Sequence, residues 1–130
     1  MNDRHQRFLR IAQRAALKTV DMKRQFSTVI VDKNRTIVVA RNMRSHTMTP
    51  NVVCPQTGKR YYGLHAEVHA LLKCDFSVEG MTAYVHGQNV KTGKKVYSKP
   101  CTLCESFLRK RKIKTVVFST QTGYEVWELE

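Results

Sequence analysis

The sequence predicts an α/β fold in which helices and strands alternate within a single domain of residues 1–130. Three observations lead to this prediction. The apolar fraction of 42% is typical of a chain that buries a core. A length of 130 residues suits one domain better than two. In the second half, short runs of β-branched residues are separated by segments with helical periodicity, as in layered α/β proteins.

A helix is expected first, over residues 3–24 of an N-terminal segment that we delimit as residues 1–24. Its cationic side chains repeat at helical spacing on one side, while apolar side chains gather on the opposite side. The cationic side, here called the basic stripe, consists of Arg4, Arg7, Arg10, Arg14 and Lys18. Such a stripe is either a solvated surface or a ridge that contacts phosphates, and the sequence leaves both interpretations open.

A β-hairpin is predicted next, at the start of a core that we place over residues 25–120. Residues 27–31 and 36–40 are rich in β-branched side chains, and the Asp and Asn between them favour a tight turn. Residues 41–63 contain Pro and Gly without a sustained period, which indicates a long loop.

The second half of the chain is expected to alternate helices with strands. Pro is well suited to the first turn of a helix, which places a helix start at Pro100. The expected elements are a helix over 65–74, a strand over 81–86, a helix from Pro100 to Leu108, and strands over 115–119 and 124–129.

The chain is strongly basic, with 23 Lys and Arg, 10 Asp and Glu, and a formal net charge of +13. Such a charge attracts the phosphates of nucleotides, nucleic acids or anionic membranes, and it also favours solubility. No apolar run is long enough to span a bilayer, and the Arg-rich N-terminus lacks the apolar stretch of a secretory signal peptide. We therefore expect a cytoplasmic protein without a membrane partner, for which access to the nucleus stays open.

Two short segments indicate chemistry: His-Ala-Glu at 65–67 and Pro-Cys-Thr-Leu-Cys at 100–104. One His and two Cys can supply three of the four tetrahedral ligands of zinc, leaving one position for water. Each segment lies where a helix is expected to begin, and the N-terminal ends of helices stabilise thiolates. We therefore expect His65, Cys101 and Cys104 to bind one Zn²⁺ per chain.

Glu67 distinguishes this pattern from a purely structural zinc site. Two residues after the His, its carboxylate can face a water at the open position, take its proton and pass it on to a leaving group. The other candidate ligands lack the spacing of a second zinc site. Cys54 and Cys74 are interpreted as loop and helix thiols, and His69 either adds a ligand or packs against the pocket.

At these residues the chain resembles the cytidine and deoxycytidylate deaminase superfamily, whose signature is His-x-Glu followed by Pro-Cys-x-x-Cys. The similarity covers about residues 26–119 and implies a three-layer α/β/α fold around a mixed five-stranded sheet. It also implies that His65, Cys101 and Cys104 hold zinc while Glu67 shuttles protons. In such enzymes a zinc-activated water attacks the amidine carbon of the base, and ammonia leaves.

The resemblance also suggests which residues contact the substrate. Asn42, at the end of the second strand, stands where the family often places a substrate-contacting Asn, and the backbone near Ala66 would hold the base. Tyr62 lies just before the motif and either stacks on a base or packs within the protein. Ser98, just before the cysteine segment, completes the expected set of substrate contacts.

We therefore expect a zinc-dependent hydrolytic deaminase acting on a cytosine nucleotide such as dCMP. The alternative is the same chemistry on cytosine or adenine in single-stranded RNA or DNA. The strand would then be held by Arg4, Arg7, Arg14, Lys18 and residues 109–114. A third hypothesis is a non-catalytic, zinc-stabilised module that binds nucleic acid, against which Glu67 argues. Assembly into a homo-oligomer stays open.

Overall fold

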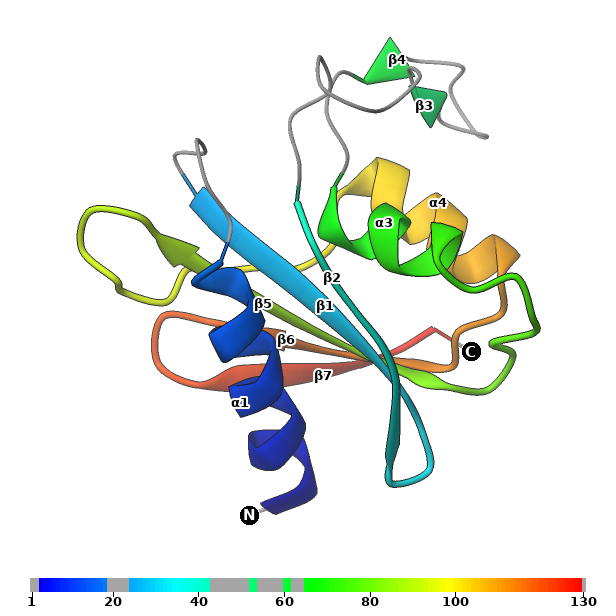
Figure 1. Cartoon of the computed structure of the whole chain (residues 1–130), viewed down its shortest axis with the longest axis horizontal. Helices are drawn as coiled ribbons and strands as arrows, with labels where there is room; N and C mark the ends of the chain where they lie inside the picture. The colour runs from blue at the N-terminus through cyan, green and yellow to red at the C-terminus, as the bar shows by residue number, and fades with distance from the viewer. Residues whose placement is uncertain (1–2, 19–23, 43–51, 54–59, 62–64, 130) are drawn as a thin grey trace.

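A computed structural model describes residues 3–18, 24–42, 52–53, 60–61 and 65–129 of the chain. Their arrangement is a five-stranded sheet with helices on both faces, together with a separate pair of very short strands (Figure 1). In chain order the elements are α1 (Asp3–Ala16), β1 (Arg24–Asp32), β2 (Arg35–Arg41), β3 (Val52–Val53), β4 (Arg60–Tyr61), α3 (Ala66–Leu72), β5 (Thr82–Asn89), α4 (Thr102–Lys110), β6 (Thr115–Ser119) and β7 (Tyr124–Glu128).

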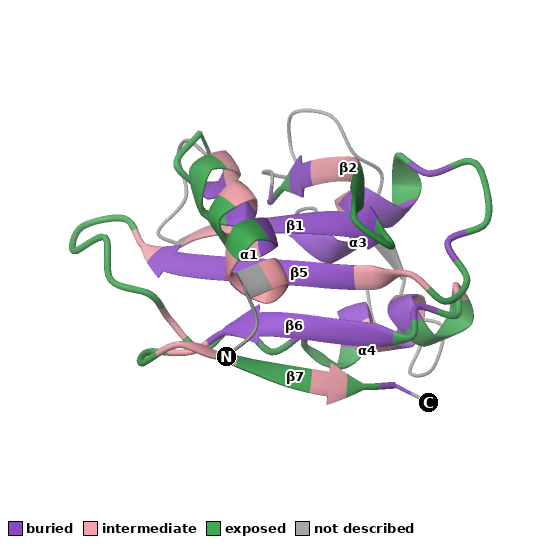
Figure 2. Cartoon of the chain, turned by 90° about the horizontal axis from the view of Figure 1, so that it is seen from below, coloured by how far each residue is buried: buried purple, intermediate pink, exposed green. Residues whose placement is uncertain are grey.

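The large sheet is mixed, with the strand order β2-β1-β5-β6-β7. β1 is antiparallel to both β2 and β5, β6 is parallel to β5, and β7 is antiparallel to β6. α1 covers one face, and α3 and α4 cover the other (Figures 1 and 2). The predicted α/β fold, with three layers around a mixed five-stranded sheet, is confirmed.

Two apolar clusters fill the space between these layers, because successive strand residues point to opposite faces of the sheet. In β5, Tyr84 packs with Phe8 on the α1 side, while Val85 packs with Leu71 and Leu108 on the side of α3 and α4. All five side chains are almost completely buried. The sheet is therefore purple along its central strands in Figure 2, and its buried strands hold the helices in place.

The first helix is shorter than predicted, since α1 ends at Ala16 rather than near residue 24. The Ser27 hydroxyl donates a hydrogen bond to the Ala12 carbonyl, and the Gln25 amide donates one to the Leu17 carbonyl at 3.4 Å. These bonds hold the start of β1 beside the end of α1, so the chain has to leave the helix early. The apolar spacing within residues 3–24 did not reveal this early end, and residues 19–23 lie outside the described residues.

Other boundaries differ because backbone pairing continues past the apolar runs. β1 begins at Arg24 and pairs with Asn89 of β5, although the residues there are polar. Residues 41–63 were predicted to be a loop, but Val52 pairs with Tyr61 in the short sheet of β3 and β4. α3 ends at Leu72, two residues before the prediction, while α4 begins at Thr102 and runs past Leu108 to Lys110. Among the described helices, none is long and apolar enough to cross a membrane.

Arg111 joins the C-terminal ends of the two helices on the same face of the sheet. It follows α4 directly, and its guanidinium donates hydrogen bonds to the carbonyls of Leu71 at 3.0 Å, Cys74 at 2.9 Å and Phe76 at 3.0 Å. The last carbonyls of a helix have no partner within the helix, so a guanidinium placed there stabilises its end. Arg111 thereby fixes α3 relative to α4.

Replacing Arg111 with Ala should lower the free energy of unfolding by about 1.5–3 kcal/mol, because three carbonyls lose a charged donor. Urea denaturation monitored by circular dichroism measures this change. Lys110→Ala is the matched control, because Lys110 is exposed on the same helix, and it should stay within about 0.5 kcal/mol of wild type. Superimposable denaturation curves for the two variants would contradict the role given to Arg111.

Candidate metal centre and active site

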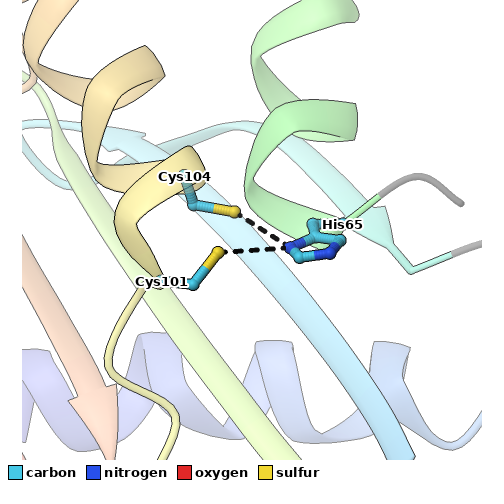
Figure 3. A group of neighbouring side chains, drawn as sticks. All are labelled: His65, Cys101 and Cys104. Carbon is cyan, nitrogen blue, oxygen red and sulfur yellow. Dashed lines mark hydrogen bonds between the residues drawn. The ribbon is translucent and has the colours of Figure 1, made fainter. Parts of the chain in front are cut away.

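The three predicted zinc ligands meet where α3 and α4 begin. His65 is the residue before α3, Cys101 is the residue before α4, and Cys104 lies in the first turn of α4. Both cysteine sulfurs point toward the His65 imidazole (Figure 3). The His65 Nδ1 lies 3.5 Å from the Cys101 sulfur and 3.3 Å from the Cys104 sulfur.

These distances fit the donor set of a tetrahedral zinc ion. All three donor atoms lie within 4.8 Å of one another. Bonds of about 2.0–2.3 Å from zinc to N and S place neighbouring donors about 3.3–3.8 Å apart, which is close to the observed separations. Three protein donors leave the fourth tetrahedral position open. Cys101 is exposed, so this side of the cluster is accessible to solvent.

The neighbouring hydrogen-bond donors already favour a thiolate at Cys101. Its pKa falls to about 4, chiefly because the Cys104 thiol donates a hydrogen bond to its sulfur, with a further hydrogen bond from His65. The same hydrogen bond and complete burial raise the pKa of Cys104, so Cys104 is the thiol of this pair. The bond to Cys101 also raises the pKa of His65. A divalent cation would displace the shared protons and bind thiolates at both sulfurs.

Glu67 lies beside this cluster without belonging to it. It sits in the first turn of α3 with only 7% of its surface exposed, and it is close enough to His65 and Cys104 for both to influence its pKa. Burial raises the pKa of Glu67 above its ordinary value. A carboxyl group with a raised pKa exchanges protons more readily near neutral pH than an exposed one. The position thus suits a proton carrier next to a metal centre.

The predicted substrate contacts lie in different surroundings. Ala66 is the fully buried first residue of α3. Asn42 follows β2, where its backbone N–H donates to the Phe26 carbonyl and its side-chain oxygen accepts from the Phe26 N–H at 3.1 Å. These bonds extend the pairing of the hairpin by one residue. Tyr62 lies outside the described residues, and the roles of all these residues toward a substrate stay predictions.

Ser98 is buried in a hydrogen-bond network that sequence analysis missed. Its hydroxyl lies 2.8 Å from that of Ser119, the last residue of β6. Ser119 also donates to the Val96 carbonyl at 3.0 Å and accepts from the Gly87 N–H at 3.1 Å. The network fixes the segment that leads to Cys101. The only sequence signal for this network was that Ser119 ends the expected strand over 115–119. The partners of the two serines are mostly backbone groups, which leave no pattern in the sequence.

The remaining candidate ligands do not join the metal cluster within the described residues. His69 lies one turn after His65, and its Nδ1 is 2.8 Å from the Arg41 carbonyl. A carbonyl only accepts, so Nδ1 carries the proton and ties α3 to the end of β2. Cys74 is buried just after α3, close to Arg111. Cys54 lies outside the described residues.

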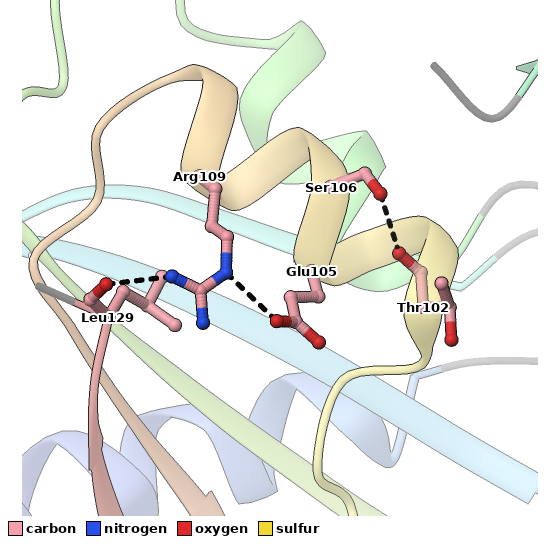
Figure 4. A network of polar contacts seen from close by, with 5 residues as sticks. All are labelled: Thr102, Glu105, Ser106, Arg109 and Leu129. Carbon is pink, nitrogen blue, oxygen red and sulfur yellow. Dashed lines mark hydrogen bonds and ion pairs between the residues drawn. The ribbon is translucent and has the colours of Figure 1, made fainter. Parts of the chain in front are cut away.

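Several cations predicted to hold nucleic acid make contacts within the protein instead. The Arg4 guanidinium donates to the Lys33 carbonyl, and that of Arg7 donates to the Asn34 carbonyl at 3.5 Å. Arg109 forms an ion pair with Glu105 at 2.8 Å and donates to the Leu129 carbonyl at 2.8 Å, next to the Ser106–Thr102 bond within α4 (Figure 4). These contacts hold α1 to the hairpin turn and α4 to the C-terminal strand.

Comparison with known proteins agrees with this geometry. The family model for the cytidine and deoxycytidylate deaminase zinc-binding region matches residues 2–120. A probable deoxycytidylate deaminase of Caenorhabditis elegans is 32% identical, over 88% of this chain and 56% of that protein. The chain therefore spans little more than half the length of this relative.

Solved structures share the fold at low sequence identity. The dCMP deaminase of the cyanophage S-TIM5 in its apo form has a TM-score of 0.64 and 16% identity, over 94% of this chain and 86% of that chain. The same enzyme in complex with dCMP and dUMP has a TM-score of 0.60 and 16% identity, over 91% and 82%. Acinetobacter baumannii RibD has a TM-score of 0.54 and 22% identity, over 91% of this chain and 28% of that chain.

The family match extends over nearly the whole chain and includes the cluster of His65, Cys101 and Cys104. The chain belongs to the family that carries the cytidine and deoxycytidylate deaminase zinc-binding region.

Proposed function

We propose that this protein is a zinc-dependent hydrolase that deaminates the cytosine of a nucleotide, with dCMP as the first candidate substrate. The observation that carries this proposal is the convergence of His65, Cys101 and Cys104 at two helix starts, with the buried Glu67 carboxyl beside them. A structural zinc site gains nothing from an uncoordinated buried carboxyl, whereas hydrolysis needs a group that moves protons.

The three ligands would hold Zn²⁺, which supplies a Lewis acid and a water of lowered pKa. Glu67 would take one proton from the attacking water and deliver it to the base, and it would then carry the second proton of that water to the departing amino group. The reaction consumes one water, replaces the exocyclic amine of cytosine with a carbonyl oxygen, and releases ammonia. Because Glu67 returns every proton that it takes, it ends each turnover in its starting state.

Two observations support a free nucleotide over a nucleic-acid strand as the substrate. The relatives are named as a probable deoxycytidylate deaminase and as a dCMP deaminase solved with dCMP and dUMP. In addition, Arg4, Arg7 and Arg109 are engaged with backbone carbonyls of the protein itself. Cations that hold the fold together are less available to follow a phosphate backbone.

Zinc content tests the ligand set. His65→Ala, Cys101→Ala and Cys104→Ala should each lose most of the bound zinc, because two protein ligands hold the ion far more weakly than three. Inductively coupled plasma mass spectrometry of the purified proteins gives the metal content. Cys74→Ala is the control and should retain zinc, since Cys74 lies outside the cluster. Full zinc occupancy in all three ligand variants would rule out this assignment.

Glu67→Gln tests the proton carrier while preserving the size of the side chain. The variant should keep its zinc and lose roughly a factor of 10²–10⁴ in kcat, the usual contribution of a general acid and base. Steady-state kinetics and metal analysis on the same preparation separate loss of proton transfer from loss of metal. A kcat within a few-fold of wild type would exclude Glu67 from this role.

A side-by-side panel tests the substrate. Conversion of dCMP, CMP and single-stranded DNA and RNA oligonucleotides containing cytosine or adenine is followed by liquid chromatography. We expect turnover of the free nucleotide and little conversion in oligonucleotides. Conversion of oligonucleotides alone would favour nucleic-acid editing. A protein that binds oligonucleotides but is inert toward every substrate would favour the non-catalytic module.

A further inference from the structure

A polar cavity lies on the face of the sheet that α1 covers. Its volume is about 390 Å³. One wall is a stripe of α1 with helical spacing, and the others come from β5, the segment that follows β5, the end of β6 and the turn into β7. The lining residues are Gln6, Leu9, Arg10, Gln13, His86, Lys95, Ser119, Thr122, Gly123 and Tyr124. In Figure 2, α1 lies over β1 and β5 and leaves much of β6 and β7 uncovered.

This cavity is separate from the metal centre because the sheet lies between them. Tyr84 packs against α1, and His86 is two residues further along β5 and so points to the same face. α3 and α4, which carry the zinc ligands, pack on Val85 at the opposite face. A small molecule bound against His86 would therefore not occupy the position next to Glu67.

The charge of the lining favours an anion. Arg10 and Lys95 are cationic and exposed, and none of the lining residues is acidic. Within the described part of the chain, neither side chain forms a hydrogen bond or ion pair that would neutralise it, in contrast to Arg4 and Arg7, which bind the hairpin turn. Two free cations beside a polar cavity attract a phosphate group.

His86 also lines this cavity and has one ring nitrogen left to accept a hydrogen bond. It is 2% exposed, and its Nε2 lies 2.8 Å from the Gln88 side-chain oxygen. The Gln88 amide donates to the Gln25 oxygen at 3.0 Å, so the Gln88 oxygen is left to accept the proton of His86 Nε2. Burial lowers the pKa of His86 and keeps the ring neutral, with Nδ1 as its acceptor. A neutral imidazole of this tautomer pairs with a hydroxyl rather than with phosphate.

We propose that this cavity binds a small phosphorylated compound with free hydroxyl groups, of the sugar phosphate class. The phosphate would lie between Arg10 and Lys95, and a hydroxyl would donate to His86. The volume is within the range of small-molecule sites and exceeds what one phosphate ion fills. The proposal does not depend on the deaminase activity.

Isothermal titration calorimetry tests the proposal. The zinc-loaded full chain is titrated separately with ribose 5-phosphate, inorganic phosphate and ribose. Ribose 5-phosphate should bind more tightly than either fragment. In the double variant Arg10→Gln/Lys95→Gln its affinity should fall roughly tenfold or more, as expected when charged donors are lost. Arg14→Gln is the matched control, because Arg14 is exposed on α1 but does not line the cavity, and it should bind like wild type.

Three results would overturn the proposal. The first is equal affinity of ribose 5-phosphate for the double variant and for Arg14→Gln, which would place the binding elsewhere. The second is inorganic phosphate binding as tightly as ribose 5-phosphate, which would remove the role of the hydroxyl groups. The third is a single-stranded oligonucleotide that binds through Arg10 and Lys95 while ribose 5-phosphate does not, which would assign this face to nucleic acid.

Discussion

The structure depends on bringing two helix starts to one point. His65 and Cys101 are separated by 36 positions in the chain, yet each precedes the first turn of its helix, and their donor atoms lie 3.5 Å apart. The unpaired N–H groups and the positive end of each helix favour the thiolates that a cation requires. The same electrostatics would favour any anion at this point, so the donor atoms, and not the helix ends alone, make the site suited to a metal ion.

The sheet explains why these helix starts coincide. β5 and β6 are parallel, so the connection between them has to cross the sheet, and α4 is that crossing element. In such units the start of the helix lies near the carboxyl end of the preceding strand, where α/β proteins commonly place their sites. Just before Cys101, the chain is held at this edge by hydrogen bonds of the Ser119 hydroxyl with the Ser98 hydroxyl and with the Gly87 N–H. At the far end, Arg111 holds α3 and α4 together.

Local signals in the sequence were sufficient to predict the helices, the strands and the grouping of His65, Cys101 and Cys104, while the three layers followed from the family resemblance. Apolar periodicity marks each element, and the spacing from Cys101 to Cys104 within one helical turn leaves little freedom for the two sulfurs. Contacts from side chains to backbone carbonyls have no such signal. The arginines at positions 4, 7, 109 and 111 were therefore predicted as surface cations, although all four bind carbonyls of the protein. The early end of α1 was missed for a related reason, since it is set by bonds to the start of β1.

The net charge of +13 therefore serves at least two physical purposes. A guanidinium is well suited to bind several carbonyls at once, because its planar donors reach in fixed directions and it never loses its charge. Arg111 shows this use most clearly, with three carbonyls around one side chain. Arg10 and Lys95 differ from Arg111 because no acidic residue lines the cavity beside them. Because β5 presents Val85 to one face and His86 to the other, a single strand supports both α3 and α4 on one side and the cavity beside Arg10 and Lys95 on the other. Counting basic residues thus overestimates the surface available to phosphates, and the contacts of each cation decide which of them remain available.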